Sequence, residues 1–243
     1  MAYAIQEEAP AGIQKAGFMT RVLTSTVFAL TWLIGVILGF RWYVLPLLCA
    51  VVAIIGVYEF IKLTKARLPL WSSAVLGVLY LVIPLACFLL LRAWGLLFAL
   101  SLLFSVWGAD TAAYIFGSLL GRHKLAPKLS PKKSWEGFIA GVFFSVVVWM
   151  VMPLIVNAIS KSVTNGITGF GVFGVVAGLL AAGAGLAGDL FESWLKRRAG
   201  VKDAGTILPG HGGILDRFDS LLAAAPVILI AVVVVSTVVW AVS

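Results

Sequence analysis

Seven long apolar stretches dominate the chain and restrict what it can fold into. They lie near residues 22–40, 42–61, 70–91, 94–117, 138–159, 169–190 and 221–242. Each has about the 20 residues that a helix needs to cross a bilayer, and a helix satisfies its own backbone hydrogen bonds there. Only 12% of the residues are charged, about half the share in a soluble domain. The sequence therefore predicts an all-α, polytopic membrane protein with about seven transmembrane helices, and excludes soluble and disordered chains.

Basic residues are distributed unevenly between the two sides of this seven-span arrangement. All of the 18 except Arg41, Arg92 and Lys161 fall on one side. Basic residues mark the cytoplasmic side of a membrane protein, so we expect a cytoplasmic N-terminus, an exterior C-terminus and an active face toward the cytoplasm in the cell (inner) membrane. The same bias accounts for the net charge of +8, so we expect no nucleic-acid partner.

The connections suggest a simple organisation. Residues 1–21 lack the pattern of a signal peptide and are expected to be a cytoplasmic tail. Residues 22–93 would be N-terminal membrane helices, and residues 94–243 a membrane domain that carries the chemistry. The second region holds two polar cytoplasmic loops, 121–137 and 191–220. Long loops in compact proteins are usually functional, whereas the exterior loops are short.

Two carboxylates, Asp110 and Asp189, lie within apolar stretches. A carboxylate at membrane depth is costly and suggests function; the alternative is a helix-end residue that reaches water. Small residues at 174, 178, 181, 185 and 188 form one helix face that permits close packing. Asp189 continues that face and should point into the protein, followed by Ser193 and Lys196.

The long loop carries the residue types that bind phosphate and Mg²⁺. Asp189 and Asp216 lie at its ends, with Asp219 three residues further. Mg²⁺ is usually held by one or two carboxylates together with substrate phosphates, and a glycine-rich run such as LPGHGG, residues 208–213, lets backbone amides approach an anion. Positive charge for phosphate oxygens would come from Lys196, Arg197, Lys202 and Arg217. This set predicts transfer at a nucleotide phosphate by positioning and electrostatics.

Each feature alone has a simpler explanation. Topology accounts for basic loop residues, His211 would more often be a hydrogen-bonding turn residue than a base, and Asp203 suits a loop ion pair. Five carboxylates within the 33 residues 188–220 are harder to dismiss. No Walker A motif, HExxH motif, CxxC pair or nucleophile elbow is present, so a covalent serine or cysteine mechanism has no support.

Three strings carry a resemblance to a known family. Residues 188–220 resemble the signature of the phosphatidate cytidylyltransferases (CDP-diacylglycerol synthases), and WGADTAAY from Trp107 and KLSPKKSWEG up to Gly137 also resemble family segments. At Ser134 the family often has threonine, so the hydroxyl is kept. The matching signature positions are Ser193, Lys196, Arg197, Lys202, Asp203, Gly205, Leu208, Pro209, His211, Gly212, Gly213, Asp216, Arg217 and Asp219.

The resemblance implies a reaction, a cofactor and partners. The family converts CTP and phosphatidate into CDP-diacylglycerol and pyrophosphate by metal-assisted attack of the lipid phosphate on the α-phosphorus. The expected cofactor is Mg²⁺, with a second cation left open, and the expected partners are CTP, phosphatidate and membrane lipid. A homodimer is also left open.

The resemblance also implies residue roles. Asp189 and Asp216 would bind metal, with Asp219 and Asp110 as further candidates. The remaining roles fall into three groups: Lys196, Arg197, Lys202 and Arg217 hold the triphosphate; Lys132, Lys133 and Ser134 contact the lipid phosphate or the nucleotide; and His211, Ser193, Gly212 and Gly213 orient or contact phosphate.

Two other functions remain open at this point. A CTP-dependent lipid or polyprenol kinase would transfer the γ-phosphate and release CDP, but the matching signature argues against it. A transporter would explain seven spans and intramembrane carboxylates. It would not explain polar residues gathered on one face, and the sequence has no internal repeat of the kind many transporters have.

Overall fold

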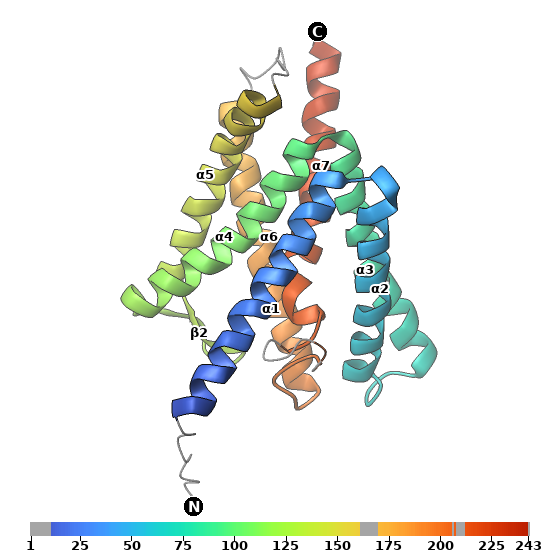
Figure 1. Cartoon of the computed structure of the whole chain (residues 1–243), viewed down its shortest axis with the longest axis vertical. Coiled ribbons are helices and arrows are strands. Elements are labelled where there is room, and N and C mark those ends of the chain that lie inside the picture. Colours follow the sequence, from blue (N-terminus) through green and yellow to red (C-terminus); the bar gives the residue numbers. More distant parts are fainter. Residues whose placement is uncertain (1–10, 161–169, 206, 208–211, 243) are drawn as a thin grey trace, which may run out of the picture.

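The computed structural model describes residues 11–160, 170–205, 207 and 212–242. Within these residues, seven long helices form a bundle, one for each apolar stretch (Figure 1). A one-turn 3-10 helix, Arg41–Tyr43, follows the first, and a two-stranded antiparallel hairpin, β1 (Lys124–Ala126) and β2 (Ser130–Ser134), follows the fourth. The helices are α1 (Ala11–Leu38), α2 (Val44–Thr64), α3 (Leu70–Trp94), α4 (Leu96–Leu120), α5 (Trp135–Ser160), α6 (Phe170–Arg198) and α7 (Leu215–Val242).

Six of the helices, α2 to α7, are long and apolar enough to cross a membrane within the described residues. In α1 the apolar run, Val22–Leu38, is shorter. The all-α class is therefore confirmed, apart from the small hairpin, with six candidate membrane spans among the described residues.

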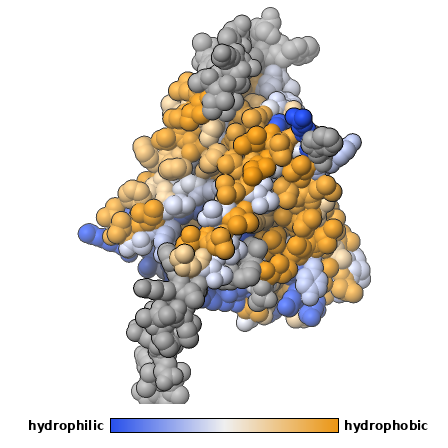
Figure 2. Space-filling model, viewed as in Figure 1, coloured by the Kyte–Doolittle hydropathy of each residue, from blue (hydrophilic) through white to orange (hydrophobic). Residues whose placement is uncertain are grey.

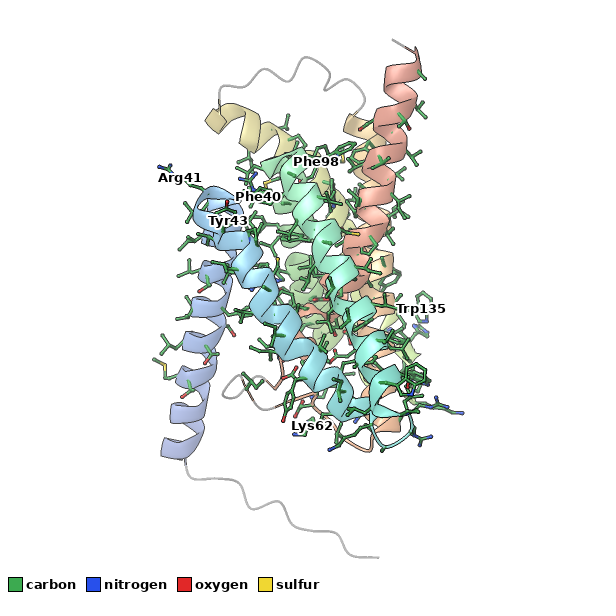
Figure 3. All side chains as sticks on the ribbon, turned by 90° about the vertical axis from the view of Figure 1, so that its right-hand side faces the viewer. Phe40, Arg41, Tyr43, Lys62, Phe98 and Trp135 are labelled. Carbon is green, nitrogen blue, oxygen red and sulfur yellow. The ribbon has the colours of Figure 1, made fainter. Side chains whose placement is uncertain are left out.

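Successive helices run in alternating directions, so the connections fall into two sets (Figure 1). One set lies at what we call the hairpin end of the bundle. It comprises the start of α1, the α2–α3 turn, the hairpin and the described residues of the loop 199–214. Figure 2 shows apolar side chains over most of the visible face, with hydrophilic ones gathered mainly at that end. Figure 3 shows Arg41 and Lys62 at opposite ends of α2, with Lys62 at the hairpin end.

The helices extend further at the hairpin end than the apolar stretches do. α1 begins at Ala11, inside the expected tail, whose first ten residues lie outside the described part. α6 continues to Arg198 and α7 begins at Leu215, so the polar loop 191–220 shortens to 199–214. Hydropathy finds only the part of a helix that meets lipid, whereas backbone hydrogen bonding continues the helix into water.

Glycines on α6 bring its backbone against two neighbours, as the small-residue face predicts. A Cβ at Gly178 would lie 2.5 Å from the Val146 Cα of α5. A Cβ at Gly188 would collide with the Asp219 backbone carbonyl of α7. The first half of the face therefore packs on α5 and the second half on α7, and the latter contact brings Asp189 close to the start of α7.

Aromatic contacts fasten α1 to the rest of the bundle. The Trp32 ring, 2% exposed, lies 4.8 Å from the Phe218 ring of α7 and 6.1 Å from the Phe88 ring of α3. Beyond the end of α1, Gly39 has a φ of +59°, and the Arg92 guanidinium packs against it while donating to the Val36 and Ile37 carbonyls. Arg92 therefore satisfies the last carbonyls of α1, which have no partner within the helix.

Candidate active site

The hairpin carries three of the predicted residues, Lys132, Lys133 and Ser134, to the base of α5. Ser134 is only 3% exposed, and its Oγ accepts a hydrogen bond of 3.2 Å from the Gly137 N–H. A Cβ at Gly137 would lie 2.5 Å from the Ala113 carbonyl of α4. This close approach of α4 and α5 fixes β2 beside α4, where Asp110 lies one turn further into the bundle.

The last turns of α6 present three polar side chains on one face, as their spacing of four and three predicts. Ser193 Oγ donates to Asp189 Oδ1 at 3.3 Å. The other Asp189 oxygen forms an ion pair with Lys133 of β2. Asp189 therefore points into the protein, as predicted, and connects α6 to the hairpin.

Lys196 connects the end of α6 to the start of α7. Its Nζ lies 2.6 Å from Asp216 Oδ1 and 3.4 Å from an oxygen of Glu192, a fully buried residue one turn back on α6. The side chains of Lys196 and Asp216 are only 13% and 9% exposed. An ion pair this sheltered from water depends strongly on both partners, because removing one leaves an uncompensated charge.

Asp216 also organises the loop in front of α7. Its Oδ2 accepts hydrogen bonds from the N–H groups of Gly213 at 2.8 Å and Ala204 at 2.9 Å. Gly212 has a φ of +84°, which favours glycine, and a Cβ there would lie 2.7 Å from Asp216 Oδ2. The glycine pair of the signature therefore makes the turn that wraps around this carboxylate.

These elements enclose a cavity of about 440 Å³ at the hairpin end. Its charged lining consists of four cations and five carboxylates, although the chain as a whole is strongly basic. Asp110 and Asp189 both lie near enough to Asp219 to interact with it electrostatically. The charged residues are Asp110, Lys132, Lys133, Asp189, Lys196, Asp203, Asp216, Arg217 and Asp219.

A second cavity, of about 290 Å³, reaches the same charged residues from another side. Its walls come from α1, α4 and α7, and include the hydroxyl-bearing residues Thr24 and Ser25. It shares with the first cavity the residues Asp110, Asp216, Arg217 and Asp219. The two cavities therefore meet at these shared charged residues, three of which lie at the start of α7.

The structure brings most of the predicted residues together, but not all of them. Arg197 is exposed, and it donates to the Val201 carbonyl at 3.4 Å. One residue further along a helix is about 100° further around it, so Arg197 cannot share the face of Lys196. Lys202 is also exposed and does not line either cavity. His211 lies outside the described residues.

Glu59 of α2 and Glu192 of α6 were not among the predicted site residues. Both are buried, at 1% and 0% exposure. Glu59 accepts backbone hydrogen bonds from Ile214 at 3.1 Å and Leu215 at 2.9 Å. Glu59 lies in an apolar stretch, so the reasoning that singled out Asp110, a carboxylate at membrane depth, applies to it equally.

The described residues contain no group of three histidine, cysteine or acidic side chains that could hold a metal ion by themselves. A magnesium site of protein and substrate oxygens needs fewer, because one or two carboxylates suffice when phosphates complete the shell. Asp189 and Asp216 already have hydrogen-bond or ion-pair partners, yet a carboxylate has about four lone-pair positions. The donor set is therefore compatible with Mg²⁺ bound together with a phosphate ligand.

Comparisons with known proteins agree with this arrangement. A model of the cytidylyltransferase family matches residues 68–235. The chain is 39% identical over 180 residues to a phosphatidate cytidylyltransferase of Staphylococcus aureus strain COL, and 40% identical over 184 residues to one of Staphylococcus epidermidis strain ATCC 35984. Both alignments cover 73% of this chain and 65% of the relative, so the matched part is shorter than the relatives themselves.

Proposed function

The chain belongs to the cytidylyltransferase family, and we propose that it transfers the cytidylyl group of CTP to phosphatidate, giving CDP-diacylglycerol and pyrophosphate. The observation that carries the proposal is the cavity in which the lysines of β2 meet the carboxylates of α6 and α7 at one end of a membrane bundle. The names of the staphylococcal relatives support the same reaction.

The reaction needs positioning more than acid–base chemistry. An oxygen of the lipid phosphate forms a bond to the α-phosphorus of CTP, while the bond from that phosphorus to the bridging oxygen breaks and pyrophosphate leaves. A phosphate monoester is already ionised at neutral pH, so a strong protein base is unnecessary. The obstacle is repulsion between two anions, which cationic groups in a sheltered site relieve.

We further propose that the site binds Mg²⁺ through Asp189 and Asp216, with Asp219 or Asp110 as additional ligands. The charged lining of the cavity has one more carboxylate than cations, which favours binding of the triphosphate together with a cation. Bound Mg²⁺ would neutralise phosphate oxygens and make the α-phosphorus more electrophilic. Lys196 and Arg217 would hold the triphosphate, and Lys132 and Lys133 the lipid phosphate or the nucleotide.

Product analysis tests this function directly. Purified protein incubated with phosphatidate, CTP and Mg²⁺ should form pyrophosphate and a lipid that carries CMP, in equal amounts. Release of CDP with a doubly phosphorylated lipid would instead identify a lipid kinase. Turnover by protein in detergent would exclude transport as the sole function, whereas uptake by sealed vesicles without any product would overturn the enzymatic proposal.

The proposed orientation has seven spans, α1 included, with the hairpin end in the cytoplasm of a cell membrane. It is supported by the excess of basic residues on that side and by the gathering of hydrophilic side chains at the hairpin end (Figure 2). In this arrangement residues 94–243 form the catalytic membrane domain and include the charged residues of the cavity.

A reporter that is active only in the cytoplasm, fused to the C-terminus, should therefore give no signal. The same reporter fused after Arg67, in the turn between α2 and α3, should be active, which controls for expression. A strong signal from the C-terminal fusion would contradict seven spans and leave an even number. It would not affect the proposed reaction, because the charged residues of the first cavity all lie between positions 110 and 219.

A further inference from the structure

Glu59 is a buried carboxylate whose hydrogen-bond partners lie 155 and 156 positions further along the chain, at the start of α7. It comes from α2, where it is 1% exposed within an otherwise apolar run. One carboxylate oxygen accepts from the Ile214 N–H at 3.1 Å and the other from the Leu215 N–H at 2.9 Å. Leu215 is the first residue of α7. Glu59 therefore satisfies amides at the start of α7 that have no acceptor within that helix.

Two glycines of the long loop pack directly on the same carboxylate. A Cβ at Gly213 would lie 2.6 Å from both oxygens of Glu59, and a Cβ at Gly205 would collide with one of them. Neither glycine has a positive φ, so the close approach of Glu59, and not the backbone conformation, accounts for the absence of a side chain. The described residues of the loop 199–214 thus pack on Glu59 at two separate points.

Glu59 and Asp216 together hold one turn of backbone. The amides of Gly213, Ile214 and Leu215 follow one another, and the first donates to Asp216 while the next two donate to Glu59. Asp216 in turn forms the ion pair with Lys196. If Glu59 moved, this single turn of main chain would move with it and would shift Asp216 and its partner Lys196.

We infer that Glu59 is a positioning residue, which holds the start of α7 so that Asp216 and Lys196 meet the nucleotide and its cation in the right place. Glu59 lines neither of the two cavities at the site, and both of its oxygens are occupied by backbone amides, so it is not a ligand itself. It precedes the region matched by the family model, which starts at residue 68. The statement that these residues meet CTP rests on the proposed function.

Glu59→Gln removes one acceptor and places an amide N–H₂ group against a backbone N–H. In the full chain, purified in detergent, we expect the KM for CTP and the Mg²⁺ concentration at half-maximal rate to rise roughly tenfold, which is less than the roughly hundredfold loss that a 1 Å misplacement of reacting groups can cause. If the lysines of β2 hold the lipid phosphate, the KM for phosphatidate should change little. Tyr58→Phe, at the exposed neighbouring position of α2, is the matched control and should behave like wild type.

Hydrogen exchange gives a second readout that needs no substrate. Peptides covering residues 212–217 should exchange faster in Glu59→Gln than in wild type or Tyr58→Phe. If the wild-type chain fails to turn over CTP and phosphatidate, the proposed function falls, while exchange still reports whether Glu59 holds the turn. Unchanged exchange in Glu59→Gln would overturn the positioning role whatever the activity.

A second variant tests the same contact without altering Glu59. Gly205→Ala should push the carboxylate away from the amides and produce the same rise in the KM for CTP. This variant decides the matter if Glu59→Gln does not fold. Wild-type KM values for CTP and Mg²⁺ in Gly205→Ala would overturn the inference. A Glu59→Gln protein that is obtained in lower yield, but whose folded fraction has wild-type KM values, would also overturn it.

Discussion

Asp189→Asn and Asp216→Asn should each lower turnover by at least roughly a hundredfold, a loss expected when electrostatic stabilisation of a transferring phosphoryl group is removed. Asparagine keeps the size of the side chain and one acceptor oxygen, so Ser193 can still donate to residue 189. What disappears is the negative charge, which a cation needs and which at residue 216 also pairs with Lys196. If both residues act through one Mg²⁺, the double variant should be little worse than either single variant, because groups that act as a unit are not additive.

The controls for this experiment separate charge from folding. Wild-type protein in EDTA should be as inactive as the variants and should recover when Mg²⁺ is added. Glu136→Gln removes a carboxylate that pairs with His123 at the base of the hairpin and should keep most of its turnover. Asparagine variants that remain active at saturating Mg²⁺ would refute the ligand assignment and direct attention to Asp219 and Asp110.

Lys196→Met should destabilise the protein as well as inactivate it. The lysine lies between Glu192 and Asp216, whose side chains are 0% and 9% exposed. Removing one partner of a buried ion pair costs about 3–5 kcal/mol, which corresponds to a fall in melting temperature of roughly 10 °C for a chain of this size. Thermal unfolding in detergent, followed by intrinsic fluorescence, measures the fall.

A second substitution distinguishes the structural from the functional role of this lysine. Glu192→Gln combined with Lys196→Met removes one of the two unpaired charges, so stability should recover in part while turnover stays low. Lys62→Met, at the exposed end of α2 (Figure 3), should change the melting temperature little, because exposed charges contribute little to stability. A Lys196→Met protein that melts like wild type would show that the pair with Asp216 is not stabilising.

The sequence predicted the parts of this structure that depend on local pattern. Apolar length located the seven long helices of the described residues, and the small-residue spacing on α6 predicted both its close packing and the inward direction of Asp189. The cluster of Asp189, Lys196 and Asp216 followed from motif spacing. These predictions succeeded because each depends on residues within a few turns of one helix or at the two ends of one loop.

The features that the sequence did not predict depend on contacts between distant segments. The pairing of Glu59 with the start of α7 joins residues that are 155 positions apart, and no local pattern encodes it. The segment between α4 and α5 was expected only to be a polar loop, and KLSPKKS has little of the alternation that marks a strand. Arg197 was grouped with Lys196 by charge, although the helix turns it away from the cavity.

The pairing of Glu59 with Ile214 and Leu215 also has a consequence for biosynthesis. Ribosomes add about 5–20 residues per second. Glu59 is therefore synthesised on the order of ten seconds before Ile214 and Leu215, whose backbone N–H groups it binds. Until then the Glu59 carboxylate lies in an apolar helix without those amides, a costly state in lipid. These two hydrogen bonds can form only after the start of α7 has been synthesised. The contact between Glu59 and α7 is therefore completed late, after α2 to α6 have emerged.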